Sequence, residues 1–91
     1  MDTSIHHDPA AHRFSTRADG IDCVLDYSLA ASVMTITHTE VPAAVGGRGI
    51  AGALVKSALD EARAKGWRVV PACSYAAAWI ERHPAYADLL A

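Results

Sequence analysis

The feature that most constrains this chain is a strand pattern, a glycine-rich turn and a helix pattern that follow one another directly. The run Ser32–Val41 is rich in β-branched residues, which favour a strand, and Pro42 ends it. Gly46–Gly52 supplies a flexible turn, and from about Gly49 the pattern predicts a helix that Gly66 ends. Its apolar residues recur at the spacing of a helix packed on one face: Ile50, Leu54, Val55, Ala58, Leu59 and Ala62.

Two strands before this unit are predicted to form an antiparallel hairpin. Arg13–Ala18 is a short strand candidate, and Asp19-Gly20 is a strong signal for a two-residue turn because both positions tolerate positive φ. The next run, residues 21–29, alternates in the manner of a half-buried strand. Its apolar face consists of Ile21, Cys23, Leu25, Tyr27 and Leu29, so Cys23 reads as a small core residue.

A further strand and helix are predicted after the glycine-rich unit. Trp67–Ala72 is a short apolar strand, and the helical crossover before it favours parallel pairing with Ser32–Val41. Ser74 can cap a second helix that runs from Tyr75 to about Arg82 and is broken by Pro84. The predicted order is β-β-β-α-β-α, an α+β fold whose mostly antiparallel sheet contains one parallel pair.

The length of the chain, 91 residues, suits a single domain with one modest core. Residues 1–11 are polar, rich in histidine and interrupted by Pro9, so we expect a flexible N-terminal tail followed by a domain of residues 12–91. His6, His7 and His12 raise the alternative of a metal site. A solvated tail is the favoured interpretation, and we expect no metal.

The strand Ser32–Val41 changes character along one face. Met34 and Ile36 begin that face, and His38 and Glu40 end it. Two interpretations are equally open: the polar end of the strand enters a cleft, or the strand surfaces there. In the first, His38 and Glu40 are candidate bases, about 7 Å apart from the rise of two residues. In the second, they form a pair that faces solvent.

The glycine-rich turn has the properties of an anion site. Glycines let the backbone approach a bulky anion, the free N–H groups of the helix point toward it, and Arg48 adds a positive charge. Gly47–Gly52 also matches G-x-G-x-x-G, but residues 71–73 lack the acidic residue of a dinucleotide site. No Gly-Lys-Ser/Thr follows to make a phosphate loop. An ordinary glycine-assisted helix start is the alternative.

Four segments, taken together at this spacing, resemble the short single-domain branch of the GNAT-type N-acetyltransferases. They are His38–Pro42, Gly47–Ala51, Pro71–Tyr75 and Glu81–Pro84, and the resemblance covers roughly residues 14–90. It implies that the strands 32–41 and 67–72 splay apart and hold acetyl-CoA between them. The cofactor-binding residues that it implies are Glu40, Val41, Gly46, Gly47, Arg48, Gly49, Ile50, Ala51, Gly52 and Ser74.

The resemblance also makes Cys73 the leading candidate for catalysis. Its thiolate would accept the acetyl group beside a helix N-terminus, which lowers a thiol pKa; the alternative is a small residue that only lines the site. His38 and Glu40 are the candidate bases. Two positions depart from the family pattern: Gly46 stands where arginine or glutamine is usual, and Ile80 stands where larger members often have a tyrosine that protonates the leaving thiolate.

The predicted function is therefore acetyl-CoA-dependent N-acetyl transfer to a small amine or a lysine, with a non-catalytic acyl-CoA-binding or regulatory module as the alternative. Eight basic and ten acidic residues give a net charge of −2 without a basic block, so we expect no nucleic-acid partner. Apolar stretches are too short for a membrane span, and the N-terminus lacks the pattern of a secretory signal. We expect a cytoplasmic monomer or homodimer with reduced thiols.

Overall fold

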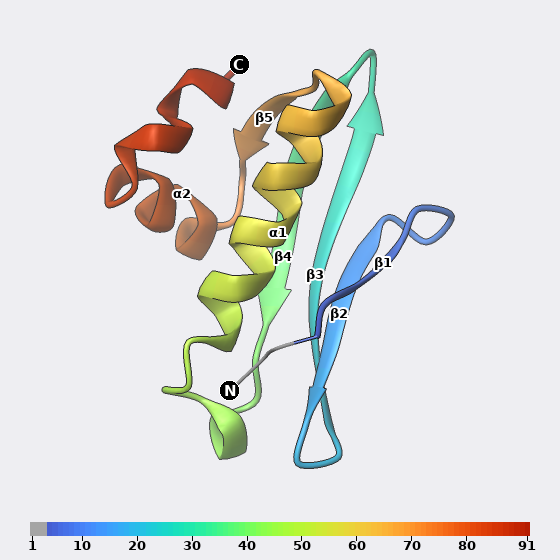
Figure 1. Cartoon of the computed structure of the whole chain (residues 1–91), viewed down its shortest axis with the longest axis vertical. Coiled ribbons are helices and arrows are strands. Elements are labelled where there is room, and N and C mark those ends of the chain that lie inside the picture. The colour runs from blue at the N-terminus through green and yellow to red at the C-terminus, as the bar shows by residue number, and fades with distance from the viewer. Residues whose placement is uncertain (1–3) are drawn as a thin grey trace.

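Five strands form one sheet in the order β1-β2-β3-β4-β5 in the computed structural model, which describes residues 4–91 (Figure 1). They are β1 (His6–Asp8), β2 (Arg13–Ala18), β3 (Ile21–Ala30), β4 (Val33–Glu40) and β5 (Arg68–Pro71). Neighbours from β1 to β4 pair antiparallel, whereas β4 and β5 pair parallel. The predicted α+β class and its single parallel pair are therefore confirmed.

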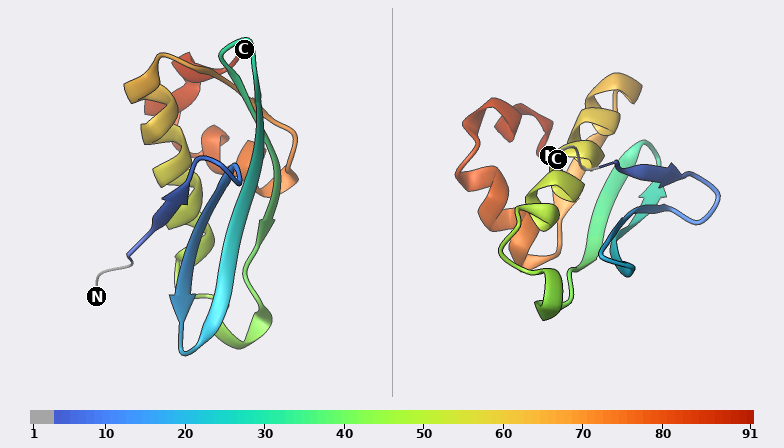
Figure 2. Two further views of the ribbon diagram at one scale, coloured as in Figure 1. Left: turned by 90° about the vertical axis from the view of Figure 1, so that its right-hand side faces the viewer. Right: turned by 60° about the horizontal axis from the view of Figure 1, so that its bottom comes forward.

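One long helix covers one face of the sheet (Figure 2). This helix, α1 (Ile50–Lys65), connects β4 to β5, and a short 3-10 helix, η1 (Ala43–Val45), precedes it. The shorter α2 (Ser74–Glu81) and the 3-10 helix η2 (Pro84–Leu89) follow β5 and pack beside it. None of the helices within residues 4–91 has the length and apolar character needed to cross a bilayer.

The core lies between α1 and the sheet. All the residues of the predicted helical stripe are buried, as the three- and four-residue spacing requires. They meet the inward-pointing residues of the strands: Phe14, Cys23, Leu25, Tyr27, Met34, Ile36 and Val69. Removing these side chains from water drives the helix onto the sheet, and it leaves the other face of the sheet, called here the outer face, uncovered by α1.

The expected tail contains an edge strand, which corrects the prediction for residues 6–8; residues 1–3 lie outside the described residues. The strand β1 pairs with β2 and is fixed by His7. The His7 ring stacks on Phe14 with centroids 4.1 Å apart, and Nε2 lies 2.7 Å from the Tyr27 hydroxyl. The polar composition of this segment did not predict a strand, because the histidine ring packs here as an aromatic residue would.

Two hairpin turns share one conformation but differ in sequence. Asp19 and Gly20 have φ of 51° and 75°, as the predicted turn requires. Ala31 and Ser32 join β3 to β4 with φ of 52° and 64°, although neither is a residue that favours this region. The second turn is therefore held in place by the strands on either side of it.

Replacing the second turn with the preferred sequence should stabilise the fold. We expect Ala31→Asn combined with Ser32→Gly to raise the free energy of unfolding by about 1 kcal/mol, because the left-handed strain is relieved. Gly20→Ala in the first turn is the control in the opposite direction, and it should lower the free energy of unfolding by a similar amount. Chemical denaturation measures both changes, and an unchanged or lowered stability of the double variant would contradict the assignment of strain.

Candidate functional site

The glycine-rich turn carries the chain from β4 to the start of α1. Val45 and Ile50 on either side of it are only 1% and 5% exposed, so the turn is anchored at both ends. Gly47 and Gly49 have left-handed φ of 78° and 77°, and a Cβ added at either position would meet no atom within 4 Å. The glycines permit the backbone conformation, and the space in front of the turn is open.

The start of α1 offers N–H groups to a ligand. Gly49 is its N-cap, so no side chain caps the helix, and no acidic residue lies in the first turn. The N–H of Ala53 donates to the carbonyl of Gly49 at 3.0 Å, which leaves the N–H groups of Ile50, Ala51 and Gly52 without an intrahelical acceptor. A phosphate would satisfy them and would lie at the positive end of the helix dipole.

Arg48 forms an ion pair with the neighbouring hairpin. Its Nη2 lies 2.8 Å from Oδ2 of Asp19 at the tip of the β2–β3 turn, with side-chain exposures of 48% and 66%. An ion pair this exposed adds little stability. It does orient Arg48, whose guanidinium has further donors for an anion at the turn.

Gly52 lies under α2. A Cβ added there would come within 3.1 Å of Nε1 of Trp79 and 3.4 Å of the Tyr75 hydroxyl. The missing side chain therefore lets α2 approach the first turns of α1. This packing role was not predicted from the sequence, where Gly52 appeared only as a residue of the turn.

A bulge in β4 changes which of its residues face α1. Ile36 pairs with Tyr27, but the preceding residue of β3, Asp26, pairs with His38. Thr37 is therefore an extra residue. One extra residue reverses the alternation of all residues that follow it in the strand.

Beyond the bulge, Thr39 pairs with Leu25 and takes the face toward α1. His38 and Glu40 lie on the outer face, because residues next to each other in a strand point to opposite faces. The prediction that they continue the apolar face begun at Met34 is therefore wrong. Nε2 of His38 lies 3.2 Å from Oε1 of Glu40, with side-chain exposures of 54% and 63%. The pair faces solvent, as in the second of the two interpretations.

The strands β4 and β5 part after Ile36 and Pro71, the last pair in their register. Beyond this point, called here the strand divergence, β4 continues to Glu40 and the chain after β5 enters α2. Cys73 lies at the strand divergence, where its N–H donates to the carbonyl of Ile36 at 2.9 Å. Cys73 is also the N-cap of α2, so the expected cap, Ser74, is instead the exposed first residue of the helix.

The thiol of Cys73 is surrounded by hydrogen-bonding groups. Its Sγ lies 3.7 Å from Oγ1 of Thr39, a residue that the sequence did not single out because nothing in it marks the bulge. Burial raises the pKa of Cys73, but hydrogen bonds from the Ala76 N–H, the Thr39 hydroxyl and the Tyr75 N–H outweigh it, and the pKa is lowered. Cys23, fully buried in the core, has its pKa raised by that burial.

The two thiols should therefore differ in their reaction with iodoacetamide. The thiolate is the reactive form, so lowering the pKa of Cys73 moves its rise in reactivity to a lower pH than that of a free cysteine peptide. We expect Cys73 to be alkylated first, and Cys23 only on unfolding. Peptide mass spectrometry across a pH series measures both, and a Cys73 profile that coincides with the free peptide would contradict the lowered pKa.

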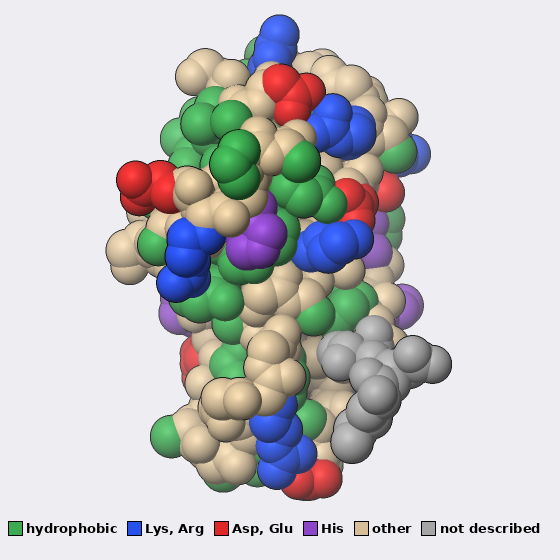
Figure 3. Space-filling view, turned by 60° about the vertical axis from the view of Figure 1, so that its left-hand side comes forward, with side chains coloured by type: hydrophobic (Ala, Val, Ile, Leu, Met, Phe, Trp, Pro, Cys, Tyr) green, Lys and Arg blue, Asp and Glu red, His purple; other side chains and the backbone are tan. Residues whose placement is uncertain are grey.

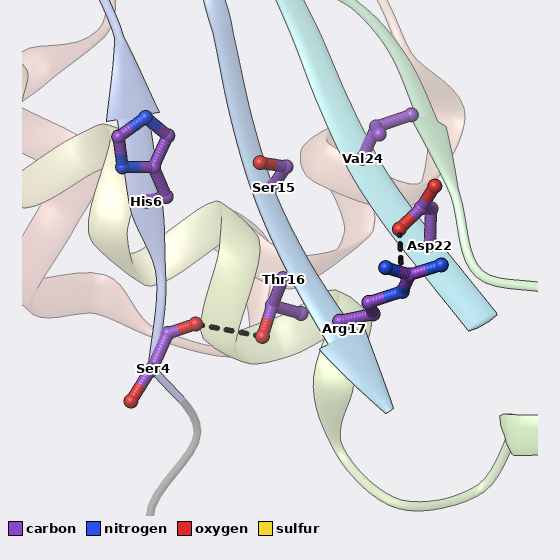
Figure 4. A pocket seen from close by; sticks show the side chains of 7 residues that line it. All are labelled: Ser4, His6, Ser15, Thr16, Arg17, Asp22 and Val24. Atoms are coloured by element: carbon purple, nitrogen blue, oxygen red, sulfur yellow. Dashed lines mark hydrogen bonds and ion pairs between the residues drawn. The ribbon is translucent and has the colours of Figure 1, made fainter. Parts of the chain in front are cut away.

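A hollow of about 410 Å³ lies elsewhere, on the outer face (Figure 4). It is lined by Ser4, His6, Ser15, Thr16, Arg17, Asp22 and Val24. These side chains come from the β1–β3 side of the sheet, and Arg17 is paired with Asp22 at 3.3 Å. None of the residues predicted for the site lines this hollow, so the candidate site remains at the strand divergence.

Two further features could mark a competing site: the charges on one face of the molecule and the arrangement of metal-ligating side chains in residues 4–91. Basic and acidic side chains are interspersed on the face that carries α2 and η2 (Figure 3), without a large patch of one sign. Among residues 4–91 there is no group of three or more His, Cys, Asp or Glu side chains arranged to hold a metal ion.

Comparison with known proteins places the chain in a family. The sequence profile described as GCN5-related N-acetyl-transferase matches residues 13–89. Protein NATD1 of Mus musculus is 34% identical over 83 residues, which cover 88% of this chain and 76% of that protein. Protein NATD1 of Homo sapiens is 32% identical over 83 residues, covering 88% and 74%.

A solved structure shares the fold. It is the solution structure of a GCN5-like protein from Staphylococcus aureus, with a TM-score of 0.76 and 23% sequence identity. The match covers 98% of this chain and 88% of the other. The family profile, the relatives and the five-stranded sheet agree, and the chain belongs to the family of GCN5-related N-acetyltransferases.

Proposed function

We propose that this protein is an N-acetyltransferase that uses acetyl-CoA as its acetyl donor and a small amine or a lysine side chain as its acceptor. The observation that carries the proposal is the placement of Cys73 at the strand divergence, beside the free part of β4 that leads to an uncapped helix start. A thiol beside this strand segment and an open glycine turn after it suit a ligand that carries a thioester at one end and a pyrophosphate at the other.

The residues available for the donor fit its chemistry. The exposed turn Gly46–Gly49 and the N–H groups that follow it would hold the pyrophosphate, with Arg48 beside it. The part of β4 beyond Ile36 has no register partner on β5, so its backbone near Glu40 and Val41 would pair with the pantetheine arm. Ser74 is exposed at the first position of α2, next to the reacting thiol, where its hydroxyl can contact the end of that arm.

The chemistry would proceed through Cys73. Its thiolate would attack the acetyl carbonyl carbon, the donor's carbon–sulfur bond would break, and CoA would leave as a thiolate. An amine would then attack the acetyl group on Sγ, forming an amide and releasing the Cys73 thiolate. We assign His38 and Glu40 to the acceptor's ammonium: the Glu40 carboxylate attracts it, and the pair takes up its proton through water from the outer face.

A non-catalytic acyl-CoA-binding module is the second candidate, favoured by one observation. Ile80 occupies the position where the resemblance leads us to expect a proton-donating tyrosine, and it is only 4% exposed. An apolar, buried side chain cannot protonate a leaving thiolate. In a binding module, the turn would hold the ligand and no acetyl group would leave it.

Turnover separates the two candidates. The purified protein is titrated with CoA and with acetyl-CoA in a calorimeter and then incubated with acetyl-CoA and a panel of small amines and lysine peptides. A transferase releases free CoA thiol faster when the right amine is present. Binding without release in any mixture would support the module, and failure to bind either ligand would rule out both candidates.

A further inference from the structure

The geometry points to Thr39 as a positioning residue for Cys73: the bulge at Thr37 turns the Thr39 hydroxyl toward the Cys73 thiol, where it holds the sulfur in place for reaction. The inference rests on the proposed function, in which Cys73 carries the acetyl group. It concerns how the sheet orients that thiol, and the bulge is the feature that brings the Thr39 hydroxyl to it.

Without the bulge, Thr39 would point away from Cys73. Counting by twos from Ile36, which faces α1, an unbroken strand would place His38 on that face and Thr39 on the outer one. The extra residue reverses this order, and Thr39 pairs with Leu25 among the inward-facing residues. Thr39 is half-buried, whereas His38 and Glu40 on either side of it are exposed.

The contact suits a thiol that must ionise. Sγ of Cys73 lies 3.7 Å from Oγ1 of Thr39, within the longer range of hydrogen bonds to sulfur. The neutral thiol donates to the hydroxyl oxygen, and after ionisation the hydroxyl rotates and donates to the thiolate. One residue can therefore orient the sulfur in both protonation states, with no change in the backbone.

Backbone hydrogen bonds also position the sulfur of Cys73. The N–H of Cys73 is fixed to the carbonyl of Ile36 at 2.9 Å, so the cysteine is attached to the same strand that carries Thr39. Burial raises the pKa of this thiol, and the groups that lower it are the N–H of Ala76, the hydroxyl of Thr39, and the N–H groups of Tyr75 and Thr39, all of them neutral hydrogen-bond donors. Such donors hold a sulfur in one direction, which a distant charge would not do.

The test is the pH profile of Cys73 alkylation in the full-length protein. Thr39→Val removes the hydroxyl and keeps the branched shape. We therefore expect the midpoint of the pH profile to move to higher pH and the alkylation rate at neutral pH to fall roughly fivefold. Thr39→Ser keeps the hydroxyl and should restore most of the rate. Thr35→Val, in the same strand before the bulge, is the matched control and should leave the profile unchanged. Thr39→Ala removes the same hydroxyl if valine prevents folding.

A profile that is unchanged in folded Thr39→Val and Thr39→Ala would overturn the inference. So would an equal change in Thr35→Val, because the effect would then be general to the strand. Alkylation needs neither acetyl-CoA nor an amine, so its result is separate from that of the proposed function. If the protein also transfers acetyl groups, Thr39→Val should lower kcat while leaving the affinity for CoA unchanged.

Discussion

Replacing Cys73 with serine should reduce acetyl transfer at least about a hundredfold while leaving the affinity for CoA intact. The serine hydroxyl is close in size, but it does not ionise near neutral pH and is a far weaker nucleophile. The neighbours that lower the pKa of the thiol, the N–H groups at the start of α2 and Thr39, remain in place. The loss is measured as release of CoA thiol, and binding is measured by calorimetry.

The matched control is the other cysteine. Cys23→Ala removes a thiol from the core, where the side chain is fully buried, so it should lower stability and leave transfer per folded molecule unchanged. Full turnover by Cys73→Ser would show that the amine attacks the donor directly and that Cys73 only lines the site.

Gly49→Ala should weaken CoA binding by roughly tenfold or more, because it places a methyl group where the phosphate would approach the backbone. Gly49 has φ of 77° and open space around it, so the variant also strains the fold. Gly66 at the other end of α1 has φ of 74° and the same open surroundings. Gly66→Ala therefore introduces the same strain, about 1 kcal/mol, away from the turn.

The comparison of these two glycine variants separates folding from binding. Both should lose similar stability in chemical denaturation, but only Gly49→Ala should lose CoA affinity in calorimetry. Equal affinities in the two variants would mean that the turn does not hold the pyrophosphate.

The sequence predicted the elements whose cause is local. The strand Arg13–Ala18 has the predicted bounds, because a turn with one favoured conformation follows it. The helix begins at Ile50 and ends at Lys65, close to its predicted limits, because glycines in the left-handed region flank both ends. Its buried stripe follows from residue spacing alone, and so does the inward face of β3.

The features that were missed depend on contacts between distant segments. The strand β1 is stabilised by the contacts of His7 with Phe14 and Tyr27, and no local sequence pattern predicts those contacts. The bulge at Thr37 is also non-local, since it is defined only by the register with β3. The bulge changes the site: the alternation in the sequence put His38 and Glu40 on the face of Met34 and Ile36, whereas in the structure Thr39 lies on that face.

The central claim is that acetyl-CoA binds along the free part of β4 with its pyrophosphate on the glycine turn. The most direct test is to titrate acetyl-CoA into isotope-labelled protein and follow the backbone amide signals by NMR. We predict that the largest shifts fall on residues 46–51 and 37–41, with a further shift at Cys73. Shifts confined to the outer-face hollow around Ser15 and Arg17, or no shifts at saturating ligand, would contradict the claim.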